Sequence, residues 1–70
     1  MPSVQKRFGK RLRELRKKRG WTLIELGDHV GLNRNYLGDV ERGERNISLQ
    51  NIELIAKGFD ITLSQFFSKL

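Results

Sequence analysis

Residues 22–42 read TLIELGDHVGLNRNYLGDVER, and this stretch predicts two short amphipathic helices joined by a tight turn. The first helix begins at Thr22, because Thr22 and Glu25 have the spacing of a capping box, in which each side chain bonds an amide at the helix start. Gly31 follows where the helix must end, since glycine adopts the left-handed conformation at least cost. The buried side of this helix is marked by apolar residues at helical spacing, Leu23, Leu26 and Val30.

The second helix of the pair begins after Asn33, a residue type that caps helix starts well. Its inward positions are Leu37 and Val40. A helix-turn-helix joins its two helices by three or four residues, often including glycine, and the turn Gly31-Leu32-Asn33 has this form. The residues left facing outward are Arg34, Asn35, Gly38 and Asp39.

Three further helices are predicted outside this motif. Residues 4–19 place Val4, Phe8, Leu12 and Leu15 on one helical face. Ser48 is suited to cap a helix over residues 49–58, and Thr62 with Gln65 forms a second capping box before a last helix. No stretch alternates with the period of a strand. We expect an all-α, compact five-helix domain that spans the whole 70-residue chain.

The composition limits the classes of function. The chain carries a formal net charge of +6 and a pI near 10.3, which indicates a polyanionic partner. It has no cysteine, so thiolate metal sites are excluded, and a lone His29 gives too few ligands for a zinc site. No membrane span, signal peptide, catalytic triad or phosphate-binding glycine loop is recognisable. We therefore expect a cytoplasmic protein that is not an enzyme, with no metal, cofactor or small-molecule ligand.

The positive charge is concentrated in the first 19 residues, where Glu14 is the single acid. Contact with nucleic-acid phosphates is the favoured interpretation, since such contacts dominate DNA affinity. A solvated basic face that aids solubility remains the alternative. The cations of this segment are Lys6, Arg7, Lys10, Arg11, Arg13, Arg16, Lys17, Lys18 and Arg19.

The segment from Arg11 to Phe67 resembles the lambda-repressor and Cro type of helix-turn-helix domain, often called the Xre family. Residues 33–59 are also similar to controller proteins of restriction–modification systems, through Arg-x-Tyr in the recognition helix and Glu-Arg followed by Arg-Asn after it. The residues that carry the family resemblance are Gly20-Trp21-Thr22, Glu25-Leu26-Gly27, Gly31-Leu32, Tyr36-Leu37, Val40-Glu41-Arg42-Gly43 and the helix from Ser48 to Phe59.

This resemblance implies a transcription regulator that binds double-stranded DNA through the major groove. The positions that contact bases in relatives fall on Asn33, Arg34, Asn35, Tyr36 and Asp39. Their chemistry fits, since Arg can bond guanine, Asn can bond adenine and Asp can accept from cytosine. For Arg34 a phosphate contact is the alternative, and for Asn35 a local cap. Tyr36 packs inward or contacts a thymine methyl, and Asp39 contacts a base or holds a neighbouring arginine.

Other positions are expected to contact the DNA backbone, namely Thr22, Arg42, Arg45, Asn46 and Lys10. For Arg45 and Asn46 a minor-groove contact or a solvated loop is the alternative. The family also pairs a basic residue of its first helix with an acidic one at the end of the third, here Arg16 and Glu41. Two positions depart from the family. Leu23 replaces a glutamine that contacts phosphate, and Gly27 replaces an alanine. Gly38, inside the recognition helix, either approaches DNA closely or is tolerated at the surface.

The last helix has more apolar residues than packing on one core requires. We therefore expect a homodimer, with an interface formed by Leu63, Gln65, Phe67 and Leu70. Its two recognition helices would lie about one DNA turn, ~34 Å, apart and contact a near-palindromic operator. Two alternatives on the same fold are an antitoxin-type protein and a module that binds protein or RNA.

Overall fold

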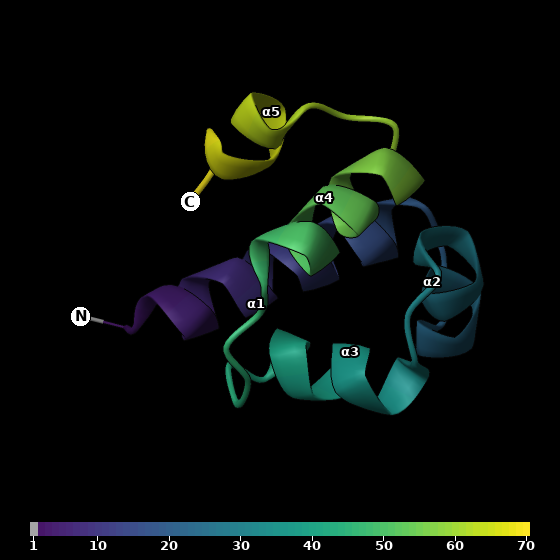
Figure 1. Cartoon of the computed structure of the whole chain (residues 1–70), viewed down its shortest axis with the longest axis horizontal. Coiled ribbons are helices and arrows are strands. Elements are labelled where there is room, and N and C mark those ends of the chain that lie inside the picture. The colour runs from purple at the N-terminus through teal and green to yellow at the C-terminus, as the bar shows by residue number, and fades with distance from the viewer. Residues whose placement is uncertain (1) are drawn as a thin grey trace.

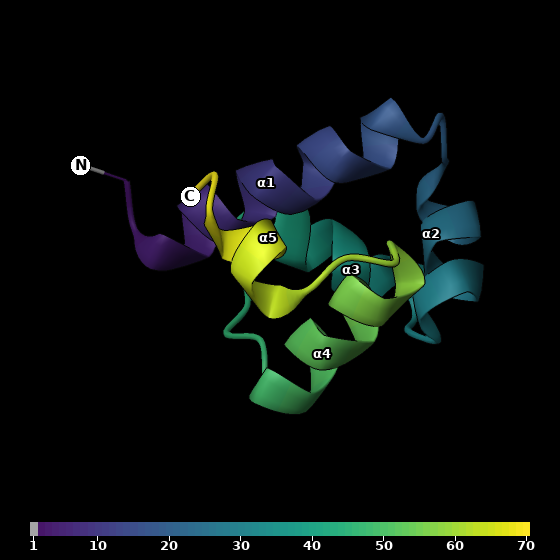
Figure 2. The same ribbon diagram turned by 90° about the horizontal axis from the view of Figure 1, so that it is seen from above.

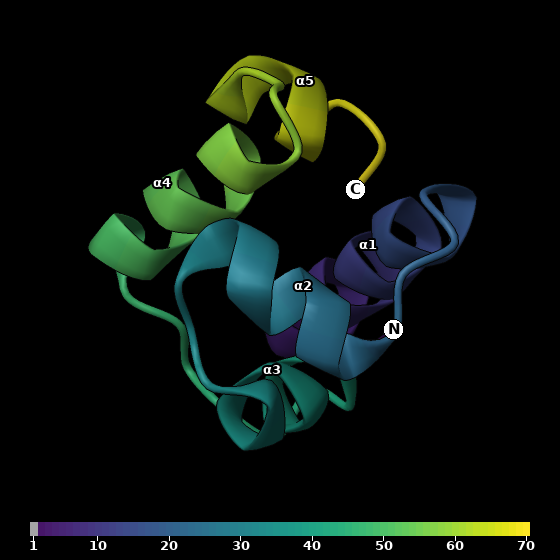
Figure 3. The same ribbon diagram turned by 90° about the vertical axis from the view of Figure 1, so that its right-hand side faces the viewer.

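The computed structural model describes residues 2–70, which form five helices and no strand. This confirms the predicted all-α architecture. α2 closes one end of the molecule, while α3 lies along one side and α5 along the opposite side, with α1 and α4 between them (Figures 1 and 3). The helices are α1 (Val4–Lys18), α2 (Leu23–Val30), α3 (Arg34–Glu41), α4 (Leu49–Gly58) and α5 (Leu63–Phe67).

The helix starts follow the caps that the sequence indicates. Both capping boxes are present, at Thr22 with Glu25 and at Thr62 with Gln65. Asn33 and Ser48 cap α3 and α4 through their side-chain oxygens. Short polar side chains at these positions accept backbone N–H groups that have no partner inside the helix, and so fix where each helix begins.

α2 ends at Gly31, whose φ of 76° lies in the left-handed region. The N–H groups of Gly31 and Leu32 both donate to the carbonyl of Gly27, at 2.8 and 3.2 Å. A residue with a β-carbon would be strained at this φ. The glycine therefore ends α2 and allows the chain to turn toward α3.

One apolar core joins all five helices. α1 packs against α3, α2 against both α3 and α4, and α4 against α5; Figure 2 shows α4 and α5 on one side of α1. α5 contributes its single buried side chain, Phe66, which lies 4.8 Å from the ring of Phe8. The buried apolar residues are Phe8, Leu12, Leu26, Val30, Leu37, Val40, Ile52, Ile55, Ala56, Phe59 and Phe66.

α1 and α3 approach closely at Gly9. A β-carbon on this residue would overlap the carbonyl oxygens of Val40 and Glu41 and lie 2.7 Å from the carbonyl carbon of Glu41. Gly9 is therefore required by the packing of the two helices, and it sets the distance between α1 and the end of the recognition helix.

No helix among the described residues has the length and apolar character that crossing a membrane requires.

Candidate nucleic-acid interface

α3 presents two polar residues from its first turn, Arg34 and Asn35, and both are exposed. The helix start is fixed by Asn33, whose carboxamide oxygen accepts the N–H of Asn35 at 2.7 Å. The cap is therefore Asn33, and the side-chain amide of Asn35 has no hydrogen-bond partner among residues 2–70. Arg34 and Asn35 thus present a guanidinium and an amide, the groups that form paired hydrogen bonds with guanine and adenine.

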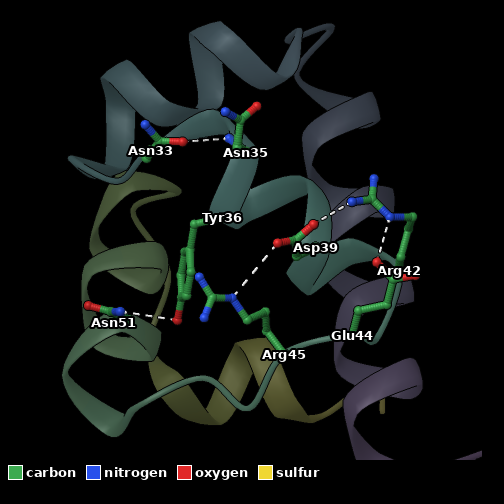
Figure 4. A network of polar contacts seen from close by, with 8 residues as sticks. All are labelled: Asn33, Asn35, Tyr36, Asp39, Arg42, Glu44, Arg45 and Asn51. Carbon is green, nitrogen blue, oxygen red and sulfur yellow. Dashed lines mark hydrogen bonds and ion pairs between the residues drawn. The ribbon is translucent and has the colours of Figure 1, made fainter.

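Tyr36 is half-buried and joins α3 to α4. Its hydroxyl accepts a hydrogen bond from the side-chain amide of Asn51 at 3.1 Å. The guanidinium of Arg45 lies 5.0 Å from the centroid of its ring, within the range of a cation–π contact. Figure 4 shows both contacts. The protein itself thus engages the hydroxyl and one face of the ring.

Asp39 is the centre of a network of four charged residues at the end of α3 (Figure 4). One carboxylate oxygen lies 2.5 Å from Nη2 of Arg42, and the other lies 3.8 Å from Nε of Arg45. Nε of Arg42 also donates to the Glu44 carboxylate at 3.0 Å. The bonds to Glu44 and Asp39 raise the pKa of Arg42. We call Asp39, Arg42, Glu44 and Arg45 the charge network.

The side chains of Asn46 and Thr22, two further proposed backbone contacts, are each held by a hydrogen bond within the protein. The carboxamide oxygen of Asn46 accepts from the side-chain amide of Gln5 at 2.5 Å, which leaves its own N–H groups facing solvent. The Thr22 hydroxyl accepts the N–H of Glu25 at 3.1 Å. Both bonds immobilise the side chain, so less conformational entropy is lost when a further partner binds.

Arg16 and Glu41 form an ion pair between α1 and the end of α3. Two guanidinium nitrogens of Arg16 reach the two carboxylate oxygens, at 2.7 and 3.0 Å, and the third donates to the carbonyl of Trp21 at 2.9 Å. The side chains are only 14% and 7% exposed. The hydrogen bond to Glu41 raises the pKa of Arg16. The pair orients α3 and takes Arg16 away from the solvent-facing cations of α1.

The expectation that Gly38 faces outward is wrong, because this residue is buried. A β-carbon there would lie 3.5 Å from the Leu23 methyl and 3.4 Å from Nη1 of Arg42. Leu23, at the position where the family resemblance led us to expect a glutamine, is partly buried and packs against the core. At this position the protein therefore has an apolar contact between α2 and α3, and not a polar side chain that could bind a DNA phosphate.

Lys10 is not brought next to the other proposed backbone contacts. It lines a shallow hollow on α1 together with Arg7, Arg11, Lys69 and Leu70. Arg11 itself is partly buried and donates to the carbonyls of Phe66 and Gln65, at 2.8 and 3.0 Å. The basic segment therefore divides into residues that hold the fold together, such as Arg11 and Arg16, and exposed cations along the rest of α1.

The four residues proposed for a dimer interface differ in exposure. Leu63 and Phe67 remain 43% and 40% exposed, although the Phe67 ring lies 5.4 Å from that of Phe66. Leu70 is packed partly against the core. Gln65 is exposed, and its side chain completes the second capping box. Leu63 and Phe67 are thus the apolar residues of α5 that a partner would cover.

Three residues with structural roles at this surface were not singled out from the sequence. Gln5 holds Asn46, Asn51 holds Tyr36 and Glu44 holds Arg42. The first two bond residues that are 41 and 15 positions away, so no local pattern identifies them. Within the described residues no group of three His, Asp or Glu side chains is placed to hold a metal ion.

Comparisons of the sequence and of the structure with known proteins both find helix-turn-helix proteins. A model of the helix-turn-helix family HTH_3 matches residues 12–66. The chain is 39% identical to control protein C.MunI of a Mycoplasma species, over all of this chain and 96% of that protein. It is 46% identical to the restriction–modification controller protein C.AhdI from Aeromonas hydrophila, whose crystal structure matches with a TM-score of 0.85 over 90% of this chain and 96% of that one.

A further solved structure includes DNA. The controller protein C.Esp1396I, crystallised as a tetramer with its natural 35 base-pair operator, is 26% identical and matches with a TM-score of 0.87 over 97% of this chain and 90% of that one. The resemblance inferred from the sequence is thereby confirmed. The chain belongs to the HTH_3 family of helix-turn-helix transcription regulators and is similar to restriction–modification controller proteins.

Proposed function

We propose that this protein is a sequence-specific regulator of transcription that binds double-stranded DNA as a homodimer, with α3 in the major groove. The observation that carries the proposal is the exposure of Arg34 and Asn35 on α3, in a chain of net charge +6. A helix that enters the major groove contacts base edges with such side chains near its N-terminus. The protein acts by binding, without catalysis.

Within this proposal the two exposed residues are the principal base contacts. Arg34 bonds the O6 and N7 atoms of a guanine, and Asn35 bonds an adenine. Asn33 contributes only its amide N–H groups, because its oxygen caps α3. Tyr36 contacts a base through the ring atoms that Arg45 does not cover, and Asp39 accepts from a cytosine after giving up a bond to an arginine.

The DNA backbone is contacted around this helix by the N-terminus of α2 and by the loop after α3. Thr22, Arg42, Arg45 and Asn46 supply these contacts. They set the register of the protein on the duplex but do not select its sequence. Lys10, on another part of the surface, contributes to long-range attraction, which decays over about 8 Å at physiological ionic strength.

The dimer forms through α5, with Leu63 and Phe67 at its centre and Gln65 and Leu70 beside them. α5 is separate from α3 (Figures 1 and 3), so a partner on α5 does not cover α3; the two-fold axis has to place both recognition helices on one face of the dimer. In such a dimer the two recognition helices should lie about one DNA turn, ~34 Å, apart. Sedimentation at micromolar concentration should detect a dimer that Phe67→Ala weakens; a monomer alone, with and without operator DNA, would contradict this part of the proposal.

The decisive test compares two arginine substitutions on DNA selected from random duplexes by the wild-type protein. Arg34→Ala should lose about 1–3 kcal/mol of binding free energy on the selected sequence and relax the preference at one base pair. Arg13→Ala removes the same charge from the exposed face of α1 and should weaken binding to all sequences alike. An unchanged sequence preference in Arg34→Ala would refute the assignment.

The same titrations distinguish DNA from other partners. A specific duplex should stay bound as salt is raised while random DNA and RNA dissociate, because non-specific binding consists mainly of phosphate contacts. Equal affinity for all nucleic acids would favour the RNA-binding or protein-binding alternative. A regulator of this kind acts in the cytoplasm, where its operator is located.

A further inference from the structure

The surface around α3 contains two acidic side chains. On a surface that binds DNA, cations raise the affinity and carboxylates lower it. Asp39 and Glu44 both lie among the groups proposed to contact DNA, and both are paired with arginines. Asp39 uses its two oxygens for two different arginines, Arg42 and Arg45, and Glu44 bonds Nε of Arg42. The four residues together carry no net charge.

This arrangement has a physical consequence for binding to phosphate. An arginine without a partner gains Coulomb energy and releases condensed counterions when it meets a phosphate. An arginine that already bonds a carboxylate exchanges one anion for another, and the carboxylate then repels the phosphate. All four side chains are between 38% and 60% exposed, so the ion pairs are individually weak and can be exchanged.

The network is also next to the proposed base contacts. Asp39 is four residues after Asn35, and residues at this spacing lie one above the other on the same helix face. Figure 4 shows the Asp39 carboxylate between Arg42 and Arg45, with the Tyr36 ring beside the Arg45 guanidinium. A duplex placed against Asn35 therefore meets Asp39 and its two arginines in the same groove.

We propose that Asp39 and Glu44 act as internal counterions, which neutralise Arg42 and Arg45 on non-specific DNA and release them to phosphates when base contacts hold α3 in the groove. The two carboxylates thus determine specificity by weakening sequence-independent binding. Asp39 also helps to place Arg45 over Tyr36, since its carboxylate forms an ion pair at 3.8 Å with the guanidinium that lies on this ring. The inference rests on the DNA-binding function proposed above.

The test uses the full chain with two duplexes: one that the wild-type protein selects from random sequences, and a shuffled duplex of the same composition. The double variant Asp39→Asn/Glu44→Gln should bind the shuffled duplex more tightly than the wild type and lose preference for the selected one. Each additional phosphate contact steepens the salt dependence by about 0.9 in log K against log salt. The measured quantity is the affinity of the variant divided by that of the wild type, both on the shuffled duplex. If the variant gains two phosphate contacts, this ratio should be about twelvefold larger at 50 mM salt than at 200 mM.

A matched control has the same change in net charge. Glu14→Gln/Glu53→Gln removes two exposed acids of α1 and α4, of which Glu53 pairs with Lys57 at 3.8 Å. Glu44→Gln alone should give part of the effect without removing a proposed base contact. The inference is overturned if the network variant and the control have the same salt dependence and selectivity. If the wild-type protein prefers no sequence, the proposed function is refuted as well. If the wild type is selective and the network variant has the same selectivity and salt dependence, only the counterion role is refuted.

Discussion

Gly9→Ala should destabilise the protein, although alanine is the better helix former. The new methyl group would lie 2.7 Å from the carbonyl carbon of Glu41 and would overlap two carbonyl oxygens of α3. Carbon atoms in good contact are about 3.5–4.0 Å apart, so α1 and α3 must separate by about 1 Å. The atoms in the way belong to backbone, which cannot rotate aside as a flexible side chain would.

The expected size of the effect follows from two opposing terms. Alanine gains about 1 kcal/mol over glycine inside a helix, while overpacking of this kind costs about 3 kcal/mol. The net loss is about 2 kcal/mol, which lowers the Tm of a domain of this size by about 8–16 °C. Urea and thermal denaturation followed by circular dichroism measure both quantities.

Gly38→Ala is the matched control, because it makes the same chemical change inside α3. A methyl group there would have ordinary contacts, 3.4 Å to Arg42 and 3.5 Å to Leu23, so the gain in helix propensity should raise stability by up to about 1 kcal/mol. A Gly9→Ala variant as stable as the wild type, or a Gly38→Ala variant as damaged as Gly9→Ala, would refute the conclusion that backbone contact at Gly9 sets the distance between α1 and α3.

Three further outcomes are expected. Glu41→Gln should lower the free energy of unfolding by about 2 kcal/mol, because it leaves the largely buried Arg16 charge without its carboxylate partner. A loss below about 0.5 kcal/mol would show that the ion pair does not stabilise the position of α3. Gly27→Ala should also destabilise, because its methyl would lie 2.6 Å from the Leu32 carbonyl oxygen; an increase in Tm would contradict this. Hydrogen bonds from the Thr22 backbone and hydroxyl lower the pKa of Glu25. The ionised Glu25 carboxylate therefore stabilises the folded protein at neutral pH, and this stabilisation is lost as the pH falls through the lowered pKa. Glu25→Gln should accordingly be less sensitive than the wild type to acid below about pH 5, and parallel acid-unfolding curves would argue against a role for the ionised capping box.

Local signals in the sequence are sufficient for most of the fold. The caps at Thr22, Asn33, Ser48 and Thr62 and the spacing of the apolar residues predict where all five helices begin and which sides they bury. These features act over a few neighbouring residues, through backbone hydrogen bonds and side-chain periodicity, and therefore remain visible in the chain before it folds. The family resemblance adds the expected partner and the positions of contact.

The tertiary structure decides what each outward residue is able to do. The sequence does not indicate that Gly38 is buried beneath Leu23 and Arg42, or that Asn51 holds the Tyr36 hydroxyl. It identifies Asp39 as an acid on the recognition helix, but only the folded loop brings Arg45 to its second oxygen. Such contacts depend on distances between separate segments, which are set by helix packing. The sequence alone therefore determined the helix-turn-helix and its candidate DNA contacts, while the packing of α1, α3 and the following loop decided which charges are neutralised before DNA binds.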